Sequence, residues 1–92
     1  MNSLTKFTIQ KLDERMNGHR IFSHRIKVYW KDDFLKLRQW MIDSFGLGCE
    51  LNLFDVNIVS ELGYTWAWDA NINRPMLYLT EEQLSAFILF NT

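Results

Sequence analysis

The sequence predicts an α+β domain with a small antiparallel or mixed sheet of about five strands, in the order ββαβββα, and two helices packed on one face of the sheet. Three observations lead to this prediction. Residues 20–30 alternate between apolar and polar as in a half-buried strand, apolar residues in 31–45 recur at helical spacing, and Thr80 opens a capping-box sequence. A chain of 92 residues fits one domain, spanning 1–92.

The first two strands are expected to form a hairpin. Residues 4–12 alternate well enough for a strand, with Phe7 and Ile9 facing the core. The dipeptide Asn17-Gly18 is a strong turn signal. Residues 20–30 follow as the best strand signal in the chain, because their even positions are mostly apolar and their odd positions mostly polar.

A helix is predicted over residues 31–45. Asp32 is expected as its N-cap, and Gly46 as a left-handed C-cap with Leu47 making the accompanying apolar contact. The apolar stripe of this helix recurs at spacings of three and four. Its members are Phe34, Leu35, Leu37, Met41, Ile42 and Phe45.

Three short strands are predicted in the second half, over residues 49–54, 64–68 and 76–79. Residues 55–63 are expected to connect the first pair, and residues 69–75 to form a polar turn between the second pair. The last two strands therefore form a hairpin.

The final helix begins after Thr80. The run Thr80-Glu81-Glu82-Gln83 matches a capping box, with Gln83 at the third helical position. Leu84, Phe87 and Ile88 are expected to form the buried stripe of this helix.

The net charge of −1 conceals a strong asymmetry between the two halves of the chain. Residues 1–46 carry a balance of +4 and residues 47–92 a balance of −5. Such asymmetry indicates charged partners, although two solvated faces that differ by chance explain it equally well. The single cysteine, Cys49, is typical of a reducing compartment, and no apolar run is long enough for a membrane span. We expect a cytoplasmic protein with no membrane partner.

The sequence shows no catalytic, metal-binding or cofactor-binding motif. His19, His24 and Cys49 lack zinc-ligand spacing, so no metal and no cofactor are expected. Ser23 and His24 are adjacent, and consecutive strand residues point to opposite faces, so we expect them to be separated. The protein is therefore predicted not to be an enzyme.

Basic and aromatic side chains alternate on the outer face of the predicted first hairpin. Arg25, Lys27 and Tyr29 lie on that face, and Lys6, on the paired strand, could join them. Arg20, at the start of the same run, is the remaining candidate phosphate contact. Cations interleaved with an aromatic ring on a sheet are one way to bind nucleic acid. The overall pI of about 6.1 argues against a dedicated nucleic-acid domain, and a solvated sheet face is the alternative.

Aromatic and acidic residues occur together in the second half. Tyr64, Trp66 and Trp68 would share one strand face, and Trp30 and Trp40 are expected near the helix–sheet core. The nearby acidic residues are Asp55, Glu61 and Asp69. Tryptophan and tyrosine dominate the energetics of protein interfaces, but such a ladder also suits a core.

The leading functional hypothesis is a small non-enzymatic protein-interaction module. It would occlude a partner through the acidic, aromatic second half, which suits a basic protein, as an accessory or inhibitor protein of phage or mobile-element type would. The alternative is a small nucleic-acid-binding protein that uses the basic hairpin. Self-association, in which the basic half of one copy meets the acidic half of another, is the third hypothesis.

Overall fold

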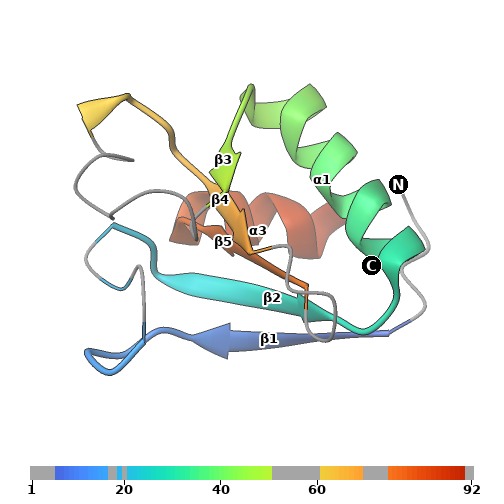
Figure 1. Ribbon diagram of the computed structural model, residues 1–92, viewed down its shortest axis with the longest axis horizontal. Coiled ribbons are helices and arrows are strands. Elements are labelled where there is room, and N and C mark those ends of the chain that lie inside the picture. The colour runs from blue at the N-terminus through green and yellow to red at the C-terminus, as the bar shows by residue number, and fades with distance from the viewer. Residues whose placement is uncertain (1–5, 17–18, 20, 51–60, 70–74, 91–92) are drawn as a thin grey trace.

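The predicted α+β architecture is confirmed in the computed structural model, which describes residues 6–16, 19, 21–50, 61–69 and 75–90. A five-stranded mixed sheet carries the helices on one face (Figure 1). The strands are β1 (Phe7–Lys11), β2 (His24–Val28), β3 (Cys49–Glu50), β4 (Ala67–Asp69) and β5 (Met76–Leu79), and the helices are α1 (Lys31–Phe45) and α3 (Glu81–Phe90).

The sheet has the strand order β1-β2-β5-β4-β3. All neighbouring pairs are antiparallel except β3 and β4, which are parallel. The two predicted hairpins, β1–β2 and β4–β5, are therefore both present. Ile26 and Val28 of the interior strand β2 are only 0% and 1% exposed, because residues of α1 and α3 pack against them.

Helix α1 has the predicted bounds, but its N-terminus differs from the prediction. Trp30 rather than Asp32 is the N-cap residue, and its side chain makes no capping hydrogen bond. Asp33, in the first turn, is buried and accepts a hydrogen bond of 3.3 Å from the backbone N–H of Lys6. The helix start is thus held by the chain entering β1 and not by a side-chain cap.

The main core lies between the helices and one face of the sheet. α1 contributes Phe34, Leu37 and Met41, and α3 contributes Leu84 and Phe87. The sheet residues that meet them are Ile26, Val28, Trp66, Leu77 and Leu79. Figure 1 shows α3 passing behind β4 and β5, on the side from which this core is built. The opposite face of the sheet is free of described helices.

Four apolar residues predicted to be buried are exposed. Trp30 is 57% exposed because the chain turns away from the sheet before α1, and Leu35 and Ile88 lie on the outer flanks of their helices at 40% and 43%. Leu47 is 71% exposed. Gly46 has the expected positive φ of 86°, but its ψ of −170° sends the chain out extended, so Leu47 does not fold back on the helix.

The backbone at Ser23 interrupts the predicted alternation. Its N–H donates to Leu79 of β5, whereas its carbonyl accepts from Leu12, next to β1. In a regular strand both groups would point to the same neighbour. Phe22 therefore packs on the face of the sheet opposite α1 and α3, not with Ile26 in the main core.

The fourth strand begins three residues later than predicted and ends one residue later. β4 begins at Ala67, so Asp69 is a strand residue instead of the start of a turn. β5 has the predicted bounds. The predictions over 51–60 and 70–74, and the turn dipeptide Asn17-Gly18, lie outside the described residues.

Candidate functional site

One face of the sheet, opposite the helices, gathers most of the polar side chains of the strands. We call it the open face. Strand register brings its residues together in two rows across the sheet. The rows are Thr8, Lys27, Met76 and Asp69, and Gln10, Arg25, Tyr78 and Ala67.

A small apolar cluster covers one end of the open face. Leu12, Phe22 and Cys49 pack there with Ala67 and Tyr78. Burial raises the pKa of the Cys49 thiol, which disfavours the reactive thiolate. This end of the face is therefore a second, minor core, and the polar end is the part available to a ligand.

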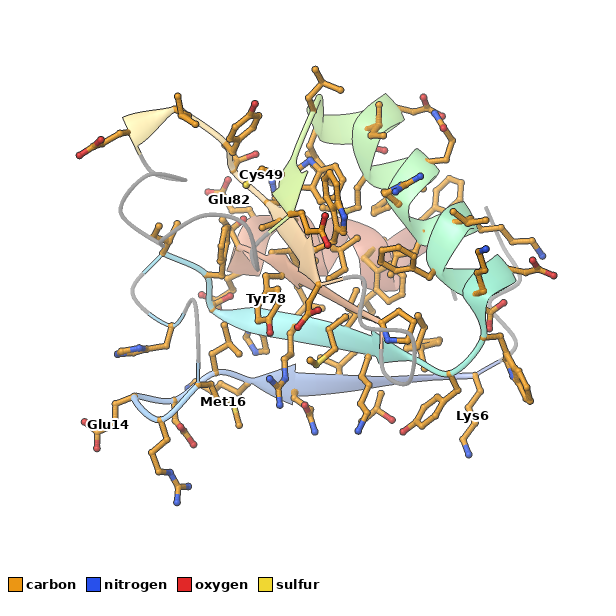
Figure 2. The ribbon with its side chains drawn as sticks, in the orientation of Figure 1. Lys6, Glu14, Met16, Cys49, Tyr78 and Glu82 are labelled. Carbon is orange, nitrogen blue, oxygen red and sulfur yellow. The ribbon has the colours of Figure 1, made fainter. Side chains whose placement is uncertain are left out.

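Two lysines flank an exposed tyrosine at the polar end. The ammonium nitrogen of Lys6 lies 4.7 Å from the centre of the Tyr29 ring, and that of Lys27 lies 5.9 Å from it. Tyr29 is 41% exposed, and its hydroxyl is 3.0 Å from the Thr8 hydroxyl. The ring thus holds two positive charges close together by cation–π attraction. Figure 2 shows Lys6 extending away from the body of the protein beyond β1.

Arg25 lies two residues before Lys27 in β2, and its side chain is held in place by hydrogen bonds. Its Nε donates a 2.7 Å hydrogen bond to Oε1 of Gln10, and its side chain also hydrogen-bonds Tyr78. Burial raises the pKa of Tyr78, and the Arg25 hydrogen bond opposes that rise. A guanidinium fixed in this way keeps its remaining donors in one orientation, which suits a planar or anionic acceptor.

Carboxylates neutralise little of this positive charge. Within the described residues, the ammonium groups of Lys6 and Lys27 and the guanidinium of Arg25 have no carboxylate within 4.0 Å, although the backbone N–H of Lys6 donates to Asp33. The ion pair found there is Arg15–Asp13, at 3.4 Å. Asp69 is the acidic residue in the two rows of the open face. Arg20, the fifth residue predicted for the basic site, lies outside the described residues.

Among the described residues, the predicted acidic, aromatic set is not brought together on one surface. Trp66 is fully buried, with 0% exposure, so its side chain is core and is not available to a partner. Tyr64 packs with the open-face cluster, whereas Trp68 packs with the main core and lies 5.6 Å from the Arg38 guanidinium. The shared face predicted for Tyr64 and Trp68 is wrong because Tyr64 precedes the strand, where alternation does not apply.

The remaining acidic members of that site are scattered. Glu61 is exposed, Asp69 is half-buried on the open face, and Asp55 lies outside the described residues. Glu61 is followed by Leu62, which is 58% exposed. Glu61 and Leu62 thus form a short exposed segment, which we call the acidic tip, and the predicted aromatic platform is not found among the described residues.

The side chains of Ser23 and His24 are hydrogen-bonded, whereas they were predicted to point to opposite faces. The irregular backbone at Ser23 lets its hydroxyl approach Nδ1 of His24 to 2.8 Å. The described residues contain no carboxylate hydrogen-bonded to His24 that would orient it as in a hydrolase triad. Across the described ranges, no three His, Cys, Asp or Glu side chains converge as metal ligands.

Sequence reasoning identified Lys6, Arg25, Lys27 and Tyr29 from strand alternation alone. It did not assign Thr8 and Gln10 to the site, although alternation places both on the same face of β1 as Lys6. It also missed Tyr78. The alternation in β1 was the available signal for the two polar residues. For Tyr78, only the pairing of β5 with β2 could have supplied it.

Comparison of the chain with protein-family models, with curated proteins and with solved structures finds no match. No helix among the described residues has the length and apolar character needed to cross a bilayer. The geometry of the open face and the chemistry of its side chains are therefore the basis for a functional assignment.

Proposed function

We propose that the protein binds single-stranded nucleic acid on the open face, with Lys6, Arg25 and Lys27 contacting backbone phosphates. The observation that carries this proposal is the convergence of these cations on the sheet face opposite α1 and α3, where their side-chain charges have no carboxylate within 4.0 Å among the described residues. Phosphate contacts of this kind supply most of the affinity for nucleic acid. Tyr29 adds a partly exposed ring for a base to contact.

A single strand fits this surface better than a duplex. The grooves of a duplex admit a helix or a two-stranded ribbon, whereas the open face belongs to a five-stranded sheet. An extended strand can lie along β2, where Arg25 and Lys27 are two residues apart, or about 6.6 Å. With an overall charge of −1, binding is expected to be weak at physiological salt and to depend strongly on it.

Fluorescence anisotropy with a labelled single-stranded oligonucleotide tests the proposal. Binding is expected at low salt, with log K falling against log salt with a slope of about −2 for three phosphate contacts. A labelled duplex of the same sequence should bind less well. Absence of binding at low salt, or binding that ignores ionic strength, contradicts the proposal.

A matched pair of charge reversals locates the site. Lys27→Glu should weaken binding by about tenfold at low salt. Lys36→Glu makes the same change of charge on the exposed surface of α1, away from the open face, and should have a much smaller effect. Equal losses in the two variants would show that net charge, and not the open face, controls retention.

A protein partner at the acidic tip is the second candidate function. Exposed Leu62 beside exposed Glu61 favours it, since an apolar residue with an acidic neighbour suits a basic protein surface. In this role the chain would act without catalysis in the cytoplasm, as an accessory or inhibitor protein of phage or mobile-element type that occludes its partner.

Charge reversal separates the two candidates. Arg25→Glu with Lys27→Glu should abolish retention on nucleic acid and leave binding of a protein partner nearly unchanged. Glu61→Lys should do the opposite. Affinity capture from the native host with each variant as bait, read by mass spectrometry, distinguishes these outcomes.

A further inference from the structure

The outer edge of β1 carries an inference that goes beyond nucleic-acid binding and does not depend on it. We infer that this edge pairs with the same edge of a second copy of the chain, across a two-fold axis at Ile9. β1 is the first strand in the sheet order, and no described strand lies on its other side. Unpaired edges of this kind accept a further strand.

Hydrogen bonding on the inner side of β1 fixes which residues face outward. The N–H of Val28 in β2 donates a 3.1 Å hydrogen bond to the carbonyl of Pro75, just before β5. Backbone groups alternate in direction along a strand, so those of Val28 and Ile26 point to β5. The backbone groups of Arg25 and Lys27 then point to β1. Their partners in β1 are Gln10 and Thr8. The backbone groups of the other β1 residues, Phe7, Ile9 and Lys11, therefore point away from the sheet.

The outward-facing residues are symmetric about Ile9, which is what a two-fold antiparallel pair requires. Ile9 falls opposite Ile9 of the second copy, and Phe7 falls opposite Lys11 of the second copy. Each outward N–H and C=O group then has a partner, as in an ordinary antiparallel ladder. The edge is thus complementary to itself with no shift of register.

The side chains agree with this register. On the helix-covered face, half-buried Ile9 meets its own copy, and the 37% exposed ring of Phe7 meets the ammonium group of the second copy's Lys11. Aromatic rings attract such cations. On the open face, Thr8 lies opposite Gln10 of the second copy. A lysine at a strand edge usually discourages pairing, but here no lysine is opposite another.

The resulting dimer would have one continuous sheet. The two open faces would lie side by side, so the Lys6, Arg25 and Lys27 sets of both copies would border one surface. Phe7 already packs edge-on against Phe87, with ring centres 5.3 Å apart, so the strand edge is braced by α3 before any partner binds.

Charge substitutions at Phe7 test the register. Phe7→Lys places a positive charge opposite Lys11 of the second copy, and Phe7→Glu places a negative charge there, while both lose the Phe87 contact. In sedimentation equilibrium over a concentration series, Phe7→Lys should raise the dimer Kd by about tenfold relative to Phe7→Glu, because each like-charge pair occurs twice. Adding Lys11→Glu to Phe7→Lys should restore the dimer.

Amide hydrogen exchange on the unaltered chain provides a test that does not depend on variants folding. The amides of Phe7, Ile9 and Lys11 should gain protection as protein concentration rises, whereas those of Thr8 and Gln10 should be protected at every concentration. A chain that stays monomeric at millimolar concentration overturns the inference. So do equal effects of the two Phe7 substitutions, or a dimer in which the Ile9 amide stays unprotected.

Discussion

The indole nitrogen of Trp66 donates a 2.8 Å hydrogen bond to the carbonyl oxygen of Gly46, at the C-terminus of α1. The indole ring also packs closely against the backbone of Gly48. A Cβ atom at Gly48 would lie only 2.6 Å from Cδ2 of Trp66. Trp66 thus satisfies a helix-end carbonyl and forms the surface on which the chain passes from α1 to β3. This contact ties a residue of the second half of the chain to the end of the first helix.

Substitution of Gly48 should therefore be costly. In Gly48→Ala the methyl group would overlap the fully buried Trp66 ring, and overpacking of this kind costs about 1–3 kcal/mol of unfolding free energy. Urea denaturation followed by circular dichroism measures it. The cost should shrink when the ring is made smaller by Trp66→Phe, so the two changes should be non-additive. Additive effects would contradict the contact.

The tryptophans should differ strongly in accessibility to a quencher. Trp30 is 57% exposed and Trp66 is 0% exposed. Iodide should quench a large part of the fluorescence in the native chain, and Trp30→Phe should remove most of that quenchable part. Trp66→Phe should instead remove shielded, blue-shifted emission. Loss of the iodide-sensitive component in Trp66→Phe would place that ring at the surface, against the structure.

The start of α3 should depend on its capping box. The Thr80 N–H donates to Oε1 of Gln83 at 3.0 Å, and the Gln83 N–H donates to Oγ1 of Thr80 at 3.3 Å. Thr80→Ala should lower the free energy of unfolding by about 1 kcal/mol, and Thr80→Ser should retain most of it. Chemical denaturation of the two variants measures the difference, and equal losses would exclude a capping role for the hydroxyl.

Gln83 has a further role that a simple cap lacks. Its Nε2 donates a hydrogen bond of 3.0 Å to Oγ1 of Thr65, and the Gln83 side chain is buried. Gln83→Glu keeps the acceptor for Thr80 but removes the donor to Thr65 and adds a buried charge. We expect it to be more destabilising at neutral pH than at pH 4, where the introduced carboxyl is largely protonated. The same denaturation assay at both pH values tests this.

Tyr78 should make the fold sensitive to alkali. Burial raises the pKa of its phenol in the folded state, so the unfolded chain loses this proton at a lower pH than the folded chain does. The protonated phenol therefore contributes to the free energy of unfolding. This contribution is complete below the ordinary tyrosine pKa of about 10, and it is lost as pH rises through the raised pKa of the folded state. Tyr78→Phe has no such proton, so its unfolding free energy should decline less between about pH 9 and 12. Parallel curves for the two proteins would contradict the assignment.

Elements defined by local patterns were predictable from the sequence. The bounds of α1 and β5 match, and the capping box at Thr80 and the positive φ of Gly46 are present. These features depend on residues within about four positions of one another, which share the same turn or strand. The errors occur where the chain leaves an element, as at Trp30, or where a strand is irregular, as at Ser23.

The candidate site was only partly predictable, for the same reason. Alternation along β2 put Arg25 and Lys27 on one face, and the β1–β2 hairpin brought Lys6 to Tyr29. Whether Trp66 belongs to the core or to an interaction surface was left open by the sequence, because burial depends on what packs above a residue. The contact of Trp66 with the end of α1 spans 20 residues of sequence, and no local pattern encodes it.

The sequence by itself determined the α+β class, the order of the elements and the polarity of charge along the chain. Only the tertiary structure decided where those charges meet. The basic hairpin pairs through β2 with β5, and β5 with β4, so Lys27 and Asp69 share a row of the open face although they belong to opposite halves of the chain. Periodicity fixes which face of a strand a residue occupies, but the pairing of distant strands fixes its neighbours, because that pairing is selected by packing of the whole core.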